Sequence, residues 1–240
     1  MDAIIQQLKT LRLSNACDAL EQQRTHPGTY SDMDFESRLG LVLEHEILSR
    51  DHNKVNRLKK QAKLRLTASA SQLDYRAERG LKKTQMAELL NGTYLLKRQN
   101  LLITGPTGAG KTYVACALAT QACEQHYTTQ YYRLNRLLDD LTSSRLDGTY
   151  QKRLHNLAKK SLLIIDDWGL EPLTQDAAAN LLEVLEDRYQ EASTIIISQV
   201  PVKEWHQLIA NSTIADAMLD RLVHQSHRIE LRGESMRKLA

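Results

Sequence analysis

The stretch that decides the fold is NLLITGPTGAGKTYVACALA, residues 100–119. A short apolar run leads into a glycine-rich turn, which leads into a long apolar segment: the pattern of a buried strand, a loop and a helix. Gly105, Gly110, Lys111 and Thr112 meet the spacing G-x-x-x-x-G-K-[ST]. Because a strand comes directly before this motif and a helix directly after it, we predict a P-loop.

A P-loop binds phosphate with its backbone. Its glycines adopt turns that are closed to other residues, so that the loop N–H groups and the helix N-terminus converge on phosphate oxygens. Lys111 would reach the terminal phosphates, and Thr112 would offer its hydroxyl to Mg²⁺. The predicted cofactors are therefore ATP and Mg²⁺. The residues expected to bind the nucleotide are Gly105, Pro106, Thr107, Gly108, Ala109, Gly110, Lys111 and Thr112.

Two carboxylates end a second apolar run, LLIIDD, at residues 162–167. Ligands of open α/β sheets lie at the carboxyl ends of the strands. We expect Asp166 to hold Mg²⁺ and Asp167 to orient or deprotonate the attacking water. One strand, at 128–134, comes between the two motifs in the chain. A paired acid with an extra strand in between is typical of ATPases, whereas simple nucleotide kinases usually have the two strands side by side and lack the second acid.

Strands and helices alternate after residue 100, which predicts a parallel sheet with helices on both faces. Besides the first strand, "LLIT", strands are predicted at 128–134, 161–167, 193–198 and 227–231. Helices are predicted at 112–124, 135–146, 151–160, 175–191 and 213–225.

The chain before residue 100 is predicted to be helical. We expect a small all-α N-terminal domain over 1–70, a basic connector over 71–99 and the α/β domain over 100–240. Short helices are predicted at 71–77 and 81–90.

Positive charge is concentrated before the α/β domain. Residues 50–83 carry 11 basic and 3 acidic side chains, which indicates a polyanionic partner. On one predicted helix we expect a row of DNA-phosphate contacts, which would be independent of base sequence: Arg57, Lys59, Lys60, Lys63 and Arg65. A second set lies between the second and third strands: Arg136, Arg145, Lys152 and Arg153.

Polar residues also follow the fourth strand. Ser198 or Gln199 could touch the terminal phosphate or the attacking water. Two arginines near the C-terminus, Arg221 and Arg237, could stabilise charge in the transition state, and one delivered by a neighbouring subunit can be worth several powers of ten in rate.

The motifs GPTGAGKT, LLIIDD, IIISQVPVKEWHQLI, IADAMLDRLVHQSHRIEL and GESMRK together resemble the AAA+ ATPases. Within that superfamily the chain is similar to the IstB-like helpers of transposition, relatives of the bacterial helicase loader DnaC. The resemblance runs over about 100–240 and extends to LKTLRLSNACDALEQQ near the N-terminus. It implies that Arg221 is the arginine finger, that Arg237 is the sensor-2 arginine, and that Ser198 or Gln199 occupies the sensor-1 position.

The chain departs from the superfamily pattern at three places. The acidic pair is Asp-Asp where many members have Asp-Glu, the sensor-1 position lacks the common Asn, and little sequence follows Arg237, so that we expect a minimal C-terminal lid. Slow hydrolysis and greater dependence on a neighbouring subunit would follow.

The resemblance implies an ATPase that forms a nucleotide-dependent homo-oligomer on duplex DNA, without base specificity, and stimulates a transposase. Two alternatives stay open at this point: a replicative helicase loader of the DnaC type, and a small-molecule kinase that uses the same loop. The acidic pair and the basic segment argue against the kinase.

The sequence shows neither an apolar run near 18 residues nor a signal-peptide pattern. Its three cysteines have no CxxC spacing. We therefore expect a cytoplasmic protein with no membrane partner.

Overall fold

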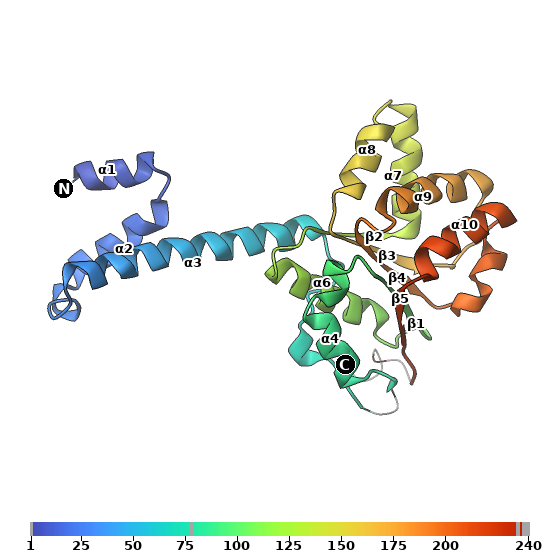
Figure 1. Cartoon of the computed structure of the whole chain (residues 1–240), viewed down its shortest axis with the longest axis horizontal. Helices are drawn as coiled ribbons and strands as arrows, with labels where there is room; N and C mark the ends of the chain where they lie inside the picture. The colour runs from blue at the N-terminus through green and yellow to red at the C-terminus, as the bar shows by residue number, and fades with distance from the viewer. Residues whose placement is uncertain (1, 77–78, 234–235, 237–240) are drawn as a thin grey trace. The chain divides into compact units, whose positions relative to one another are not determined.

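The computed structural model describes residues 2–76, 79–233 and 236. The chain forms two compact units, residues 1–57 and 58–240, which we describe separately (Figure 1). Among the described helices, none has the length and apolar character needed to cross a bilayer.

The N-terminal unit is helical, as predicted. It consists of α1 (Asp2–Thr10), α2 (Ser14–Thr25), a 3-10 turn (Pro27–Thr29) and most of α3 (Phe35–Ala62). Its core is small, with Ala16, Ala19 and Val42 at the centre. The buried Glu46 carboxylate of α3 accepts a hydrogen bond from the Ala16 amide at 2.8 Å. This bond caps the first turn of α2 with a side chain from another helix.

The second unit contains the predicted five-stranded parallel sheet. Its strands are β1 (Asn100–Thr104), β2 (Thr129–Arg133), β3 (Leu162–Trp168), β4 (Ser193–Ser198) and β5 (Ser226–Glu230). They lie in the order β2-β3-β4-β1-β5, and each neighbouring pair is parallel. The strand between β1 and β3 is therefore β4, whereas the strand predicted at 128–134 lies at the sheet edge as β2.

Helices cover both faces of the sheet (Figure 1). One face carries α4 (Lys83–Leu90), α5 (Thr93–Leu96) and α6 (Lys111–Glu124). The other carries α7 (Leu134–Leu146), α8 (Tyr150–Ala158), α9 (Gln175–Arg188) and α10 (Ser212–Val223). Alternation along β1 divides its side chains between two cores: Leu101 and Ile103 pack with α6, and Leu102 packs on the opposite face.

The segment expected to be a connector contributes to the core of the second unit. Leu73, Leu81 and Met86 are buried beside the residues of β1 and α6. The predicted helix at 71–77 is wrong, because the described part of that range holds only the end of a 3-10 turn, Ala70–Gln72. Apolar residues are too widely spaced here for a helical period to reveal this packing.

The buried side chain of Arg188 links α9 to the C-terminal end of α8 and to the start of β4 by hydrogen bonds. Its guanidinium donates to the carbonyls of Leu157, Lys160 and Ser193 and to the Thr194 hydroxyl, at 2.5–3.1 Å. Burial lowers the pKa of this guanidinium to about 9, so that it still carries its proton at neutral pH. The four acceptors satisfy a charge that would otherwise be costly to bury.

Replacing Arg188 with Leu should lower the free energy of unfolding of the second unit by about 3–5 kcal/mol, because buried carbonyls lose their donor. The measurement is chemical denaturation followed by tryptophan fluorescence, since Trp168 and Trp205 are buried in this unit. The half-exposed Arg98 gives the control, and R98L should cost under about 1 kcal/mol. Equal losses in the two variants would contradict this role of Arg188.

Candidate nucleotide-binding site

The P-loop, residues 105–110, joins the end of β1 to the start of α6. Gly105, Gly108 and Gly110 all have positive φ angles. At Gly105, with φ +145°, an added Cβ would lie 2.3 Å from the Leu231 carbonyl oxygen. Backbone conformation and close packing therefore both require glycine there. The loop leads directly into the N-terminus of α6, whose free backbone N–H groups attract phosphate.

Lys111 lies along the loop with its charge held by backbone carbonyls. Its Nζ donates to the oxygens of Gly105 at 2.7 Å and Pro106 at 2.9 Å. Burial lowers the pKa of the ammonium, and the nearby carboxylates of Asp166 and Asp167 oppose that shift. The ammonium is thus already positioned at the P-loop, where the terminal phosphates would bind.

Thr112, in the first turn of α6, is hydrogen-bonded to Asp166 on β3. The Thr112 hydroxyl donates to Asp166 Oδ2 at 2.9 Å, and the Tyr131 hydroxyl donates to the same oxygen at 2.7 Å. Asp166 Oδ1 accepts from the Asp167 amide at 2.8 Å. A hydroxyl beside a carboxylate is a hard oxygen donor set that suits Mg²⁺ completed by phosphate and water. The described residues contain no cluster of three or more His, Cys, Asp or Glu that could hold a metal instead.

Asp167 stands in a left-handed backbone conformation, with φ +65°. It lies at a register shift of β3, where pairing with β4 changes between Ile165 and Trp168. Its Oδ2 lies 3.5 Å from Arg133 Nε and 3.9 Å from Arg65 Nη1. The irregular strand therefore turns the second carboxylate away from the ladder and toward two guanidinium groups.

Arg65 does not lie on α3 with the rest of the predicted basic row. The helix expected to carry five positive charges ends at Ala62, and Lys63 turns the chain with φ +51°. Arg65 Nη1 lies 3.7 Å from Asp166 Oδ2, inside the nucleotide cavity. Lys59 remains on α3 and pairs with Glu124 at 2.8 Å. The end of α3 at Ala62 could not be predicted from the sequence, because no glycine or proline marks it.

Of the two candidates at the carboxyl end of β4, Ser198 and Gln199, only Gln199 is bonded to the loop by its side chain. Its Oε1 accepts from the Thr107 hydroxyl at 2.5 Å. The Ser198 hydroxyl is used structurally: it donates to the Trp168 carbonyl at 2.7 Å and accepts from the Val200 amide at 2.9 Å. Both residues nevertheless line the cavity.

The cavity has two adjoining parts. The first, of about 540 Å³, is lined by the P-loop, the acidic pair, Arg65 and Gln199. The second, of about 300 Å³, is more apolar; it shares Gly110 and Tyr113 with the first and is also lined by Leu81 and Leu231. Sequence reasoning missed this second wall, because half of it comes from the segment taken to be a connector.

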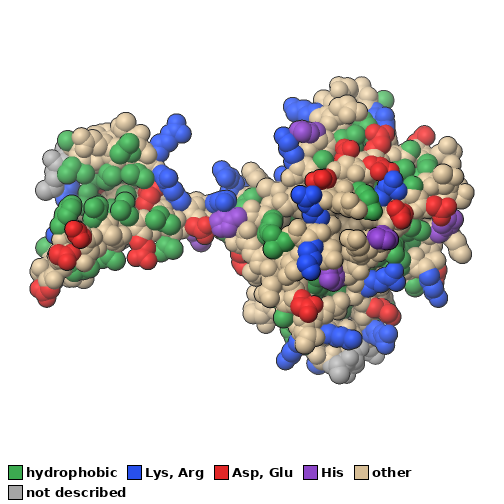
Figure 2. All heavy atoms as spheres, viewed as in Figure 1, with side chains coloured by type: hydrophobic (Ala, Val, Ile, Leu, Met, Phe, Trp, Pro, Cys, Tyr) green, Lys and Arg blue, Asp and Glu red, His purple; other side chains and the backbone are tan. Residues whose placement is uncertain are grey.

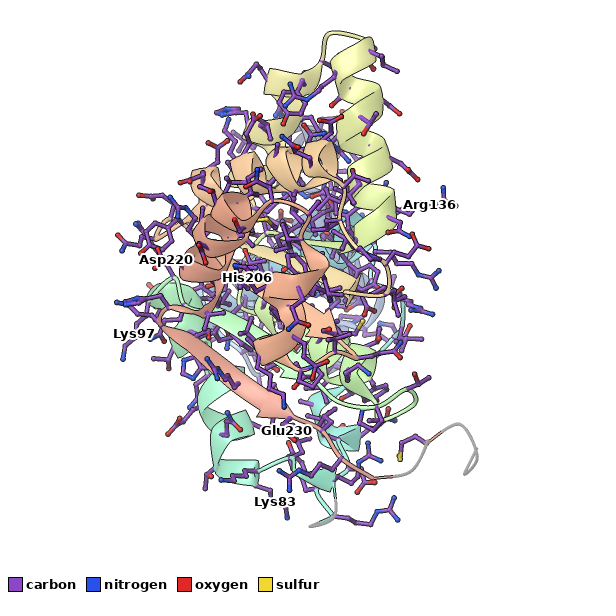
Figure 3. All side chains as sticks on the ribbon, turned by 90° about the vertical axis from the view of Figure 1, so that its right-hand side faces the viewer. Lys83, Lys97, Arg136, His206, Asp220 and Glu230 are labelled. Atoms are coloured by element: carbon purple, nitrogen blue, oxygen red, sulfur yellow. The ribbon has the colours of Figure 1, made fainter. Side chains whose placement is uncertain are left out.

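Arg221 lies at the opposite end of the sheet from the P-loop of its own chain. Its carbonyl accepts from Asn100 Nδ2 at 2.8 Å, at the start of β1, whereas the loop follows Thr104. The strand between them spans about 13 Å. Figure 3 shows Lys97 and Asp220 toward the start of β5 and Glu230, which pairs with Thr104, at its carboxyl end. Within its chain the Arg221 guanidinium pairs with Glu186 at 2.6 Å.

The other predicted residues are scattered. Arg237 lies outside the described residues. Arg145 bonds to Asn180 and Glu183, and Arg153 bonds to Tyr132 and Asp140. Arg136 is 81% exposed and projects from α7 (Figure 3), and Lys152 on α8 is also exposed. The structure therefore does not bring the second basic set together as a single row.

Comparison with known proteins decides the family. The model of the family described as "IstB-like ATP binding protein" matches residues 6–240. The chain belongs to the IstB-like ATP binding protein family. This confirms the family resemblance found in the sequence, and with it the predicted ATP ligand and ATPase class.

Relatives and solved structures agree with this family. A "Putative insertion sequence ATP-binding protein" of Sinorhizobium fredii is 43% identical, over 98% of this chain and 95% of its own. An insertion sequence IS1162 putative ATP-binding protein of Pseudomonas fluorescens is 46% identical over 82% of this chain and 85% of its own. The structure of DnaI matches with a TM-score of 0.60 at 21% identity, covering 70% of this chain and 92% of that one. DnaA of Aquifex aeolicus matches with a TM-score of 0.61 at 15% identity, over 74% and 54%. At these identities the two structures support the AAA+ fold alone.

Replacing Gly105 with Ala should weaken binding of a fluorescent ATP analogue by at least about tenfold, because the loop must move away from Leu231 and leave its phosphate-binding shape. Gly148 offers a matched control: its φ is also positive, +75°, but an added Cβ would meet nothing within 4 Å. G148A should bind the analogue like the wild-type protein. Similar affinities in the two variants would show that the Leu231 contact does not shape the loop.

Proposed function

We propose that this protein is an ATP-dependent helper of a transposase that assembles on duplex DNA. The names of its relatives, insertion sequence ATP-binding proteins, supply the transposition context. The position of Arg221 carries the assembly part of the proposal. This arginine is too far from its own P-loop to act there, so a neighbouring subunit's site is where it would act.

Within one subunit the roles follow from the contacts described. The loop amides and Lys111 bind the triphosphate, and Thr112 with Asp166 would hold Mg²⁺. When bound, Mg²⁺ would neutralise part of the phosphate charge. Asp167 orients the attacking water or takes its proton, and Gln199 faces the same space.

The remaining roles belong to the assembled protein. Arg221 of a neighbouring subunit would stabilise charge on the transferred phosphoryl group, after releasing Glu186. Arg237 would complete the site from the C-terminal end. The apolar second part of the cavity would take the base and sugar of the nucleotide.

DNA would be held through its phosphates. Arg57, Lys59, Lys60 and Lys63 remain candidates at the C-terminal end of α3 and just beyond it, and Arg136 and Lys152 are exposed on the ATPase unit. Figure 2 shows Lys and Arg side chains interspersed with Asp and Glu over the larger unit. Contacts of this kind carry no base sequence information and weaken with salt.

The proposal is tested by sedimentation of the full chain with duplex DNA, with and without Mg·ATP. Wild-type protein should sediment as a large DNA complex only with ATP. K111A should remain unassembled because it loses the triphosphate, and D167A should assemble but fail to dissociate because it binds without hydrolysing. Sedimentation unchanged by ATP would refute the proposal, and assembly on single-stranded DNA alone would favour the helicase-loader alternative.

A mixing experiment tests the shared site. R221A and K111A should each hydrolyse ATP at least about tenfold more slowly than wild type in the presence of DNA. Mixed together they should recover part of the activity, because some interfaces then join an intact P-loop to an intact Arg221. Mixing R221A with the double variant K111A/R221A is the control and should recover nothing. Absence of recovery in the first mixture, with both variants present in the complex, would place the action of Arg221 elsewhere.

A further inference from the structure

Arg65 is a charged side chain in the nucleotide cavity that the proposed mechanism does not use. It comes three residues after the end of α3, beyond the turn at Lys63. Its Nη1 lies 3.7 Å from Asp166 Oδ2 and 3.9 Å from Asp167 Oδ2, and its side chain is 32% exposed. It also lines the cavity with Lys111 and Thr112. One guanidinium is thus close to both acidic side chains to which the metal and the water are assigned.

The groups around Arg65 favour its charged form. A guanidinium keeps its proton throughout the physiological pH range, and the carboxylates of Asp166 and Asp167 lie within 4 Å of this one. Arg133 Nε also lies 3.5 Å from Asp167 Oδ2. Arg65 is therefore a permanent cation, and its carboxylate partners are the two that the site needs for chemistry.

A divalent cation and this guanidinium compete for the same oxygens. Thr112 and Asp166 offer the hydroxyl and carboxylate that suit Mg²⁺, and Arg65 approaches the same Oδ2 of Asp166. Two positive charges at such short range repel each other strongly in a partly buried site. The guanidinium fork, however, binds phosphate oxygens as well as it binds carboxylates. A triphosphate in the cavity gives Arg65 a second partner within the same space.

We propose that Arg65 is a residue of the nucleotide site that neutralises Asp166 and Asp167 in the metal-free protein and passes to the triphosphate when a divalent cation binds. Asp167 is then released from one of its two guanidinium neighbours, and Arg65 adds positive charge near the phosphates. The inference rests on the ATP site of the proposed function but not on assembly or on DNA.

The test uses the nucleotide-free full chain and Mn²⁺ as the probe, with bound and free ion separated by electron paramagnetic resonance. R65Q removes the charge and keeps a hydrogen-bonding side chain beside Tyr131, and R65K keeps the charge. R65Q should bind Mn²⁺ at least about threefold more tightly than wild type, because the competing cation is gone, and R65K should stay within about twofold of wild type. The exposed β5 residue Arg228 supplies the surface control, and R228Q should bind like wild type.

A second measurement separates competition from simple structural support. At saturating Mg·ATP without DNA, R65Q should hydrolyse at least about tenfold more slowly than wild type, and R65K should recover part of the loss. Mn²⁺ affinity in R65Q equal to or below that of wild type, or unchanged hydrolysis, would overturn the inference. If wild-type protein binds ATP and assembles on DNA while R65Q shows either result, the proposed function survives and only the role of Arg65 is lost. If wild type binds no ATP, both fail.

Discussion

Asp166 is the point at which the P-loop, the sheet and the segment after α3 meet. Its carboxylate is almost fully buried and accepts from Thr112, Tyr131 and the Asp167 amide. A buried carboxylate without such donors would be costly. The bond from Thr112 also joins the first turn of α6, directly after the P-loop, to the carboxyl end of β3. Position and charge at this one residue therefore fix how the phosphate-binding loop faces the acidic strand end.

The sequence predicted the parts that repeat a local pattern. Apolar runs identified β1, β3 and β4, and glycine spacing identified the loop, because both signals lie within a few adjacent residues. The sequence could not place Arg65, because the end of α3 is set by packing rather than by a stop residue. It also could not show which of Ser198 and Gln199 has its side chain bonded to the P-loop. The side chains of adjacent residues point in different directions, and the local backbone at the end of β4 decides which one faces the loop.

The structure also revises the prediction for residues 71–99. Composition marked them as a basic connector, yet Leu73, Leu81 and Met86 are buried against β1 and α6, and the apolar part of the cavity uses this segment as a wall. The polar side chains dominate the composition, and the few apolar ones carry the packing. The segment that follows α3 in the chain is therefore part of the ATPase core and of the cavity wall, and is not a separate linker.

The backbone at Asp167 has a consequence for how this acidic pair could have diverged. A left-handed conformation, φ +65° in this chain, is tolerated by aspartate and asparagine far better than by longer side chains. Glutamate, the residue common at this position in the superfamily, would gain reach toward water but would strain the strand by about 1 kcal/mol. Exchange between the two acids is therefore not a neutral step here. A lineage that acquired glutamate would have to reshape the bulge of β3 as well, so the choice of acid and the shape of the strand would be inherited together.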